Sequence, residues 1–327
     1  MTTHTLLLLE SAYQRLGSEI KAQAPDLRIL TMDDTGNFAL DGSPVAQADI
    51  APSIAWMGLD LFSSKSSATF TEAVLHSDGL QWAQTALAGV DAPMFKQIVD
   101  NGTLLSSSDA QAASVADFVV GSVIAHLQRY VHRHELQAAR KWQPYPFREV
   151  GRTRWLIIGY GSIGQEVAKR VHGFGASIVG VRRQPHDDPW ARVTTPDHLP
   201  AELPNADIVV LACALTDATR GMVDATFLSQ MQRQSILVNV GRGALVVDAD
   251  LLNALDDGHI EHAVLDVFDP EPLPEADPYW QHPSVLVTSH GSSFGDGMAE
   301  RGDALFLANL QRFLAGEPLH KEVRAIP

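Results

Sequence analysis

A glycine-rich turn between an apolar run and a helix-like segment constrains the fold of this chain more than any other feature. Residues 155–158 are continuously apolar, residues 163–174 have helical periodicity, and between them lies the sequence Gly159-Tyr160-Gly161-Ser162-Ile163-Gly164. A G-x-G-x-x-G sequence in this setting is typical of the first strand–turn–helix unit of a doubly wound parallel sheet. Gly159 permits the tight turn, and Gly164 allows the helix to pack closely on the strand.

The chain after the glycine motif repeats the alternation of strand and helix. Helix-like segments such as residues 248–257 separate further apolar runs, which lie at residues 177–181, 208–212, 236–240, 263–267 and 285–288. Runs that are continuously apolar suit strands that are buried on both faces of a parallel sheet. We therefore expect a doubly wound α/β domain of the Rossmann type over residues 109–292.

The first hundred residues predict a second, smaller α/β domain. Its strand candidates alternate with helix-like or turn-like segments and lie at residues 5–9, 27–30, 53–57 and 82–85. Residues 113–139 carry apolar residues at helical spacing and predict one long helix, or two joined ones, bridging the domains. A last helical pattern at residues 298–314 would return the chain to the first domain. We therefore expect a discontinuous, flavodoxin-like domain of residues 1–108, completed by residues 293–327.

Length, charge and cysteine content narrow the class of protein. The 327 residues suit two domains, and the net charge of −15 argues against broad binding to nucleic acid or to an anionic membrane. Cys213 is the only cysteine, so no intramolecular disulfide is possible and a reducing compartment is expected. We find no apolar stretch of the roughly 20 residues that a membrane helix needs, no signal-peptide pattern and no Cys/His metal spacing. We therefore expect a cytoplasmic protein with no bound metal.

The glycine motif also predicts a ligand. In its strand–helix setting, Gly161 lets the backbone approach a pyrophosphate, and the start of the helix at Ser162 and Ile163 offers N–H groups and a partial positive charge. The alternative is a glycine-rich turn without a ligand, which does not account for the strand and the helix on either side. We expect this turn to bind a dinucleotide.

The residues after the next strand of this domain predict which dinucleotide binds. An NAD site usually has Asp or Glu here, which accepts hydrogen bonds from the ribose 2′-hydroxyl. This chain has Arg182 and Arg183 instead, and the forked donors of arginine suit a 2′-phosphate that a carboxylate would repel. We expect NADP(H) to be preferred over NAD(H). The alternative is that both arginines are solvated charges at the end of a strand.

Polar residues follow three later strands, at the sheet edge where doubly wound folds bind ligands. Arg242, Glu271 and His290 lie in these segments. Reduction of a 2-oxo acid needs hydride at the carbonyl carbon and a proton at its oxygen, which His290 would supply. Glu271 would favour the charged imidazolium, and Arg242 would bind the substrate carboxylate and polarise the carbonyl. Each residue alone has an ordinary surface or packing interpretation, but their joint placement favours an active site.

On these motifs the chain resembles the D-isomer-specific 2-hydroxyacid dehydrogenase family over nearly its whole length. Besides the glycine motif, the resemblance rests on the segments WAQTALAGVD at 82–91, SVAD at 114–117, LACALTDATRG at 211–221, VNVGRG at 238–243, DVFDPEP at 266–272 and TSHGS at 288–292. The chain is most similar to the glyoxylate/hydroxypyruvate reductase branch of that family.

The resemblance implies a site and an assembly. Arg242, Glu271 and His290 match the family's catalytic residues, and the backbone amides around Leu87, Ala88 and Gly89 match its loop for the substrate carboxylate. Thr219 and Asp266 match positions that contact the cofactor, and we expect further cofactor contacts from Cys213, Val240, Gly241 and Ser292. Family members are typically homodimers built through the cofactor domain. The chain departs from the family pattern at Gln111, Ala214 and Ser289, none of which is a catalytic group.

These features predict an NADP-preferring oxidoreductase that reduces small 2-oxo acids of the glyoxylate or hydroxypyruvate type to D-2-hydroxy acids. One alternative is a non-catalytic dinucleotide-sensing protein on the same fold, against which the intact Arg242, Glu271 and His290 argue. Another is oxidation of formate or phosphite, which the pairing of Glu271 with His290 disfavours. A structural or scaffold protein would leave the glycine motif unexplained.

Overall fold

The computed structural model describes residues 4–323 and divides them into two α/β units. The smaller unit contains the described residues up to Gln111 together with those from Asp296 onward, and the larger unit is Ala112–Gly295. We expected the chain to change unit after residues 108 and 292, and it does so three residues later in each case. The first shift arises because helix α4 begins at Ala112 and belongs wholly to the larger unit.

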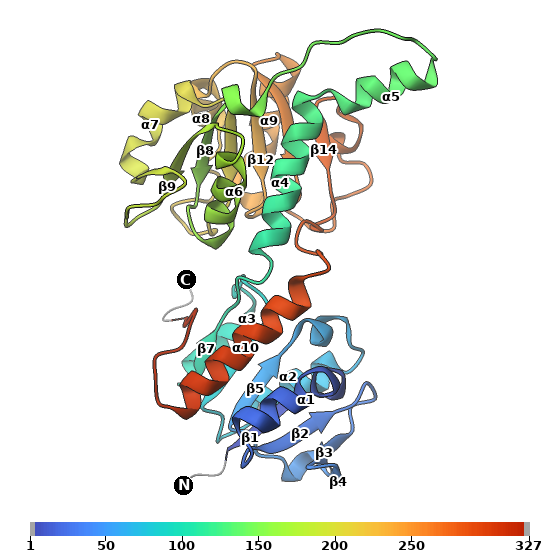
Figure 1. Ribbon diagram of the computed structural model, residues 1–327, viewed down its shortest axis with the longest axis vertical. Helices are drawn as coiled ribbons and strands as arrows, with labels where there is room; N and C mark the ends of the chain where they lie inside the picture. The colour runs from blue at the N-terminus through green and yellow to red at the C-terminus, as the bar shows by residue number, and fades with distance from the viewer. Residues whose placement is uncertain (1–3, 324–327) are drawn as a thin grey trace. The chain divides into compact units, whose positions relative to one another are not determined.

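The smaller unit is built around a mostly parallel sheet with strand order β4-β3-β2-β1-β5-β6-β7 (Figure 1). Its strands are β1 (Thr5–Leu9), β2 (Arg28–Met32), β3 (Phe38–Leu40), β4 (Ser43–Val45), β5 (Ile54–Met57), β6 (Trp82–Thr85) and β7 (Leu104–Ser106). Its helices are α1 (Glu10–Gln23), α2 (Ser67–Leu75), α3 (Pro93–Asp100) and α10 (Met298–Leu314). The order of the parallel strands is the flavodoxin-like 2-1-3-4-5, as predicted.

An antiparallel hairpin of β3 and β4 extends this sheet and was missed by the sequence analysis. The two strands have three residues each, too few for a period of two to be recognised. The turn between them contains Asp41 and Gly42, whose φ angles are 50° and 83°. Positive φ at both central residues defines the type I′ turn that joins paired strands, and an Asp-Gly pair is its usual sequence. That pair was the available signal for the hairpin.

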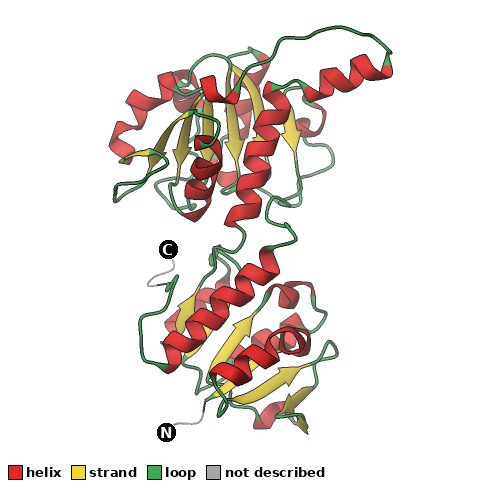
Figure 2. Cartoon of the chain, viewed as in Figure 1, coloured by secondary structure: helices red, strands yellow, loops and turns green. Residues whose placement is uncertain are grey.

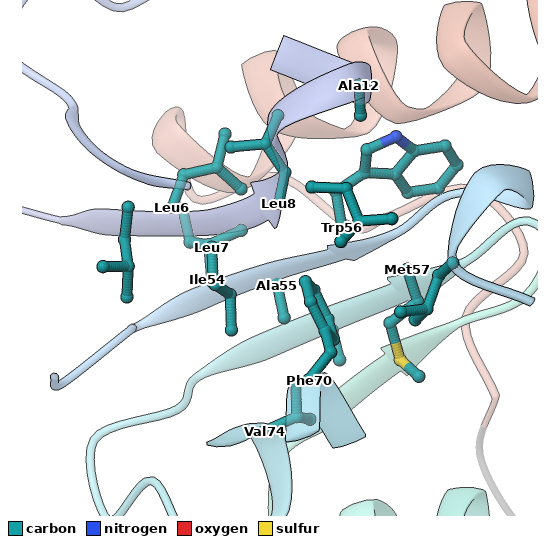
Figure 3. Packing of buried hydrophobic residues seen from close by; sticks show 14 of the residues in the cluster. Leu6, Leu7, Leu8, Ala12, Ile54, Ala55, Trp56, Met57, Phe70 and Val74 are labelled. Atoms are coloured by element: carbon teal, nitrogen blue, oxygen red, sulfur yellow. The ribbon is translucent and has the colours of Figure 1, made fainter. Parts of the chain in front are cut away.

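Helix α10 completes the core of the smaller unit although it lies some 200 residues further along the chain than β6 and β7. The Phe306 ring of α10 stacks on the Trp56 ring of β5 at 4.8 Å, and the Asn309 side chain donates a hydrogen bond of 2.8 Å to the Gln84 side chain of β6. Figure 3 shows Trp56 on the α10 side of the sheet and Phe70 of α2 on the other side. Burial of large side chains such as these contributes roughly 1.5–3 kcal/mol each. Met57 of β5 is also fully buried and belongs to this core.

The larger unit contains a wholly parallel sheet with strand order β10-β9-β8-β11-β12-β13-β14. Its strands are β8 (Arg154–Ile158), β9 (Ser177–Val181), β10 (Arg192–Thr194), β11 (Ile208–Leu211), β12 (Ser235–Asn239), β13 (Ile260–Leu265) and β14 (Val285–Val287). In chain order this is 3-2-1-4-5-6 with one strand added, which is the Rossmann arrangement. The strand order reverses between β8 and β11, where such sheets bind ligands. The predicted fold class is therefore confirmed.

Helices cover both faces of the larger sheet (Figure 2). The helices of this unit are α4 (Ala112–Leu127), α5 (Tyr130–Ala138), α6 (Ser162–His172), α7 (Leu199–Glu202), α8 (Ala225–Gln230) and α9 (Asp248–Asp256), of which α5 has no buried residue. Helices α4 and α6 pack together over one face, and α8 and α9 pack together over the other. The predicted helix at 113–139 is thus two helices, separated at Arg129, whose φ is 56°. Within residues 4–323, no helix combines the length and the apolarity that crossing a bilayer requires.

Candidate functional site

The glycine motif forms a tight turn between β8 and α6. Gly159 has a φ of 95°, and a Cβ there would overlap the backbone that joins Ala212 to Cys213 after β11. A Cβ on Gly164 would lie 2.8 Å from the Gly159 carbonyl oxygen, so helix and turn approach too closely for a side chain. A Cβ on Gly161, by contrast, would point into open space. The turn thus presents bare backbone at the reversal of strand order, which fits the pyrophosphate of a dinucleotide.

Helix α6 strengthens this fit. It begins at Ser162, directly after the turn, and continues for 11 residues, so its dipole places partial positive charge beside the motif. The Ile163 side chain packs partly buried against the core on the α4–α6 side of the sheet. Backbone donors and the helix dipole are therefore what the glycine turn itself offers to a pyrophosphate.

The loop after β11 touches the glycine turn, and the loop after β12 touches the loop after β11. The Cys213 backbone lies against Gly159, and a Cβ on Gly241 would be 2.9 Å from the Cys213 carbonyl oxygen. Burial raises the pKa of the Cys213 thiol to about 11, so this side chain stays neutral. Val240, which directly precedes Gly241, is also buried. The Thr219 hydroxyl accepts a hydrogen bond from the Thr216 amide and donates one to the Ala214 carbonyl, each at 2.8 Å, so it is engaged within its own loop.

Arg182 and Arg183 directly follow β9. Arg182 Nη1 lies 3.1 Å from His186 Nε2, and the Arg182 amide donates to the Thr194 carbonyl of β10. Arg183 is exposed, and among residues 4–323 its guanidinium has no hydrogen bond or ion pair. Both arginines thus lie at the carboxyl end of the strand next to the glycine turn, with forked donors available to an anion.

Glu271 and His290 form a hydrogen-bonded pair. His290 Nδ1 lies 2.8 Å from Glu271 Oε2, and the side chains are 49% and 36% exposed, respectively. The other carboxylate oxygen of Glu271 accepts a hydrogen bond of 2.9 Å from the Phe268 amide. Glu271 is therefore held at both oxygens, and it in turn orients the imidazole ring while leaving it open to solvent.

The buried carboxylate of Asp266 positions the loop that carries His290. It accepts hydrogen bonds from the Thr288 hydroxyl at 2.7 Å, the Gly291 amide at 2.9 Å and the Ser292 amide at 3.1 Å. The His290 amide donates to the Asp266 carbonyl at 2.8 Å, and His290 itself has a φ of 50°. A positive φ is costly for a residue with a side chain, so the surrounding hydrogen bonds must maintain it. We had assigned Asp266 and Ser292 to the cofactor, and the sequence analysis missed this anchoring role.

Arg242 follows the neighbouring strand β12, and its loop is held by the buried side chain of Asn239. The Asn239 amide group donates to the Arg242 carbonyl at 2.9 Å, and its oxygen accepts from the Gly241 amide at 3.1 Å. A Cβ on Gly243 would overlap the Phe268 backbone, so this loop packs directly on the residue whose amide Glu271 binds. The loops of Arg242, Glu271 and His290 are therefore adjacent. The sequence analysis did not identify Asn239, although a buried amide at the end of an apolar strand is a signal for such a role.

The smaller unit contains the proposed carboxylate loop after β6. The Leu87 amide donates to the Thr85 hydroxyl at 3.2 Å, so it is already occupied. In the described part of the chain, the amides of Ala88 and Gly89 have no hydrogen-bond acceptor. Of the three expected donors, these two are thus the ones available to a carboxylate. Over the same described residues, His, Cys, Asp and Glu side chains form no group of three or more suited to a metal ion.

Comparisons with known proteins agree with this geometry. A family model for the NAD binding domain of D-isomer specific 2-hydroxyacid dehydrogenases matches residues 120–292. Glyoxylate/hydroxypyruvate reductase A of Yersinia enterocolitica is 29% identical over 71% of this chain and 76% of its own length. The structure of a D-isomer specific 2-hydroxyacid dehydrogenase family protein from Aeromonas salmonicida covers 99% of both chains, with 28% identity and a TM-score of 0.78.

A D-isomer specific 2-hydroxyacid dehydrogenase from Xanthobacter autotrophicus, solved with NADPH and MES, is also similar. It is 25% identical with a TM-score of 0.76, over 99% of this chain and 98% of that one. The family match spans more than half of this chain and includes the glycine turn and the segments of Arg242, Glu271 and His290. The chain belongs to the D-isomer specific 2-hydroxyacid dehydrogenase family.

Proposed function

We propose that this protein is a reductase of small 2-oxo acids, of the glyoxylate or hydroxypyruvate type, that yields D-2-hydroxy acids with NADPH as reductant. The observation that carries the proposal is the hydrogen bond between Glu271 and His290, at the same sheet edge as a turn that fits a pyrophosphate. The relatives named glyoxylate/hydroxypyruvate reductase support the substrate class.

We assign a task to each side chain. When bound, NADPH supplies the hydride for the carbonyl carbon. Glu271 occupies Nδ1 of His290, so Nε2 is the nitrogen left to donate a proton to the carbonyl oxygen. Arg242 binds the substrate carboxylate and polarises the carbonyl. In the reverse reaction, neutral His290 accepts the hydroxyl proton.

The preference for NADP(H) rests on Arg182 and Arg183. Two guanidinium groups lie at the end of β9 where a carboxylate would select the 2′-hydroxyl of NAD. The similar protein from Xanthobacter autotrophicus was solved in complex with NADPH, which supports the same choice here. A dinucleotide-sensing protein without turnover would share the glycine turn but has no use for an oriented Glu271–His290 pair.

One panel of assays tests these proposals. The purified protein is mixed with NADPH or NADH and with glyoxylate, hydroxypyruvate, pyruvate or a larger 2-oxo acid, and cofactor oxidation is followed at 340 nm as is usual for nicotinamides. We expect oxidation of NADPH with glyoxylate and with hydroxypyruvate. The product from hydroxypyruvate should have the D configuration. No oxidation with any acid would contradict the reductase, and faster turnover with NADH would contradict the cofactor preference.

We also propose that the protein is a homodimer assembled through the basic arm, which we define as residues 129–148. This arm contains five Arg or Lys residues and one acidic residue in a chain whose net charge is −15. Helix α5 within it has no buried residue and extends from the larger unit (Figure 1), and Trp142 is fully exposed. A basic surface with an exposed large aromatic residue suits a second copy of this acidic chain.

Light scattering coupled to size exclusion tests the dimer. We expect about twice the chain mass of 35.5 kDa for the native protein and the monomer mass for Trp142→Asp. Phe174→Asp is the matched control, because Phe174 is an exposed aromatic of the same unit outside the basic arm. A native monomer, or a Trp142→Asp protein that remains dimeric, would contradict the proposal.

A further inference from the structure

The segment that carries the two arginines also carries two acids, and this creates a problem for an anion site. Arg182 and Arg183 are followed within six residues by Asp187 and Asp188. The Arg182 guanidinium already lies beside His186, two residues before Asp188. If the Asp188 carboxylate turned toward the guanidinium groups, it would compete with a phosphate for them and would repel the phosphate itself. A device that fixes the Asp188 side chain would therefore leave the two arginines to the phosphate.

The structure contains such a device in the glycine motif. The Tyr160 hydroxyl donates a hydrogen bond of 2.8 Å to Asp188 Oδ1, and the Trp190 amide donates to the same oxygen at 2.9 Å. Two donors thus hold one oxygen of Asp188. Asp187 differs, because it is exposed and, within residues 4–323, has no hydrogen bond or ion pair.

Tyr160 is itself rigidly placed. Its side chain is 1% exposed, and a Cβ at position 180 would overlap its ring, so glycine at 180 in β9 provides the space that the ring occupies. Burial, together with the hydrogen bond to Asp188, raises the pKa of the Tyr160 hydroxyl above its ordinary value. The hydroxyl therefore remains protonated, and a donor, at every pH at which the protein would be assayed.

Tyr160 links the glycine turn to both ends of the segment of residues 182–188, which carries the two arginines. The Tyr160 amide donates to the Val181 carbonyl at 2.9 Å, immediately before Arg182, and its hydroxyl binds Asp188 at the far end of the segment. Between them, His186 Nε2 lies 3.3 Å from the Gln165 side-chain nitrogen of α6. These contacts hold the segment next to the turn that fits the pyrophosphate.

We propose that Tyr160 is a specificity-determining positioning residue, whose hydroxyl sequesters the Asp188 carboxylate so that Arg182 and Arg183 remain available to the 2′-phosphate of NADP(H). The proposal rests on the NADP preference proposed above and goes beyond it, because it assigns part of the cofactor choice to a residue of the glycine motif that does not contact the phosphate.

Calorimetric titration with NADP⁺ and with NAD⁺ tests this role without relying on turnover. Tyr160→Phe keeps the ring beside position 180 and removes only the hydroxyl. We expect it to weaken NADP⁺ binding by about threefold to tenfold and to change NAD⁺ binding by less than about twofold, because only NADP⁺ has the 2′-phosphate. Adding Asp188→Asn to Tyr160→Phe should restore NADP⁺ binding, since the released side chain no longer carries charge.

Two single variants are the controls. Asp188→Asn alone disturbs no buried ring and should bind NADP⁺ within about twofold of the native protein, because the charge that it removes is already sequestered. Asp187→Asn removes an equal charge from the same segment without touching Tyr160, and should not rescue Tyr160→Phe. Thermal unfolding of each variant checks that the fold is kept.

The outcomes separate this proposal from the cofactor preference on which it rests. Native protein that binds NAD⁺ as tightly as NADP⁺ would overturn both. With a native preference for NADP⁺, an equal loss of both dinucleotides in Tyr160→Phe, a failure of Asp188→Asn to rescue it, or a tenfold loss in Asp188→Asn alone would overturn only the role of Tyr160.

Discussion

Two histidine–carboxylate pairs lie at opposite ends of strand β13, and their surroundings differ. His290 and Glu271 belong to loops beyond the carboxyl ends of the strands, 2.8 Å apart and about half exposed. His126 and Glu261 lie near the amino end of β13, 3.1 Å apart, and their side chains are 22% and 24% exposed. The residue types and the spacing of the two pairs are nearly the same, so they cannot by themselves distinguish a catalytic pair from a structural one.

The neighbours of the second pair are what make it structural. Glu261 also binds Arg148 at 2.8 Å, and the His126 ring stacks on the ring of His262 at 4.1 Å. Burial would raise the pKa of Glu261, but the His126 hydrogen bond and the Arg148 charge lower it overall. Burial, aided by His126, lowers the pKa of His262 to about 4. Glu261 thus has two partners and the His126 ring is stacked on a second ring, whereas the His290 side chain is 49% exposed.

Replacing the histidine of each pair should distinguish the two pairs most clearly. We expect His290→Asn to lower kcat by about 10²–10⁴-fold, because the proton donor is lost while the dinucleotide turn is untouched. His126→Asn, its matched control in the same unit, should keep kcat within about twofold. Steady-state kinetics with NADPH and the best acid of the panel measures both. Equal losses in the two variants would contradict the assignment of His290 as the acid.

Replacing the two carboxylates should give smaller effects of different kinds. Glu271→Gln keeps an oxygen for the Phe268 amide but replaces the carboxylate oxygen that binds His290 Nδ1 with an amide nitrogen, so we expect kcat/KM to fall about tenfold to thirtyfold. Glu261→Gln should leave kcat/KM unchanged and lower the unfolding temperature instead, because Arg148 loses its partner. Loss of activity in the Glu261 variant with a normal unfolding temperature would reverse the roles of the two pairs.

Much of the site was predictable because it depends on periodicity and on one rule of topology. Continuous apolar runs located β8, β9, β11, β12 and β14 to within a residue or two, and the carboxyl-edge rule then selected Arg242, Glu271 and His290. The short strands β3, β4, β7 and β10 were missed because three residues do not establish a period.

The hydrogen-bonding role of Asp266 was not predictable in the same way. Its partners are amides at Gly291 and Ser292, which face it only because His290 has a positive φ. Sequence spacing does not give the backbone angles of a loop, so it cannot say which donors a buried carboxylate meets. The hydrogen bond from Tyr160 to Asp188 was also not predictable from sequence spacing. It depends on the space that Gly180 leaves for the Tyr160 ring, which only the folded structure shows.

The smallest expected effect concerns stability in acid and tests His262, whose ring stacks on His126 of the structural pair. His262 has a pKa of about 4 in the folded protein against about 6.5 when unfolded, so the unfolded chain binds more protons between these values. The free energy of unfolding should therefore be largest above pH 6.5 and fall as the pH falls toward 4. His262 is also close to His126, Glu261 and His282, whose charges modify this fall but do not reverse its sign.

Urea unfolding at pH 7.5 and pH 5 measures the effect. We expect the native protein to lose about 1–2 kcal/mol more between these pH values than His262→Gln does, because glutamine cannot take up the proton. His198→Gln, at an exposed histidine of the same unit, should behave like the native protein. If His262→Gln showed the full native loss, burial would not be what keeps this ring neutral. The difference from the exposed Glu271–His290 pair would then lie only in position along β13.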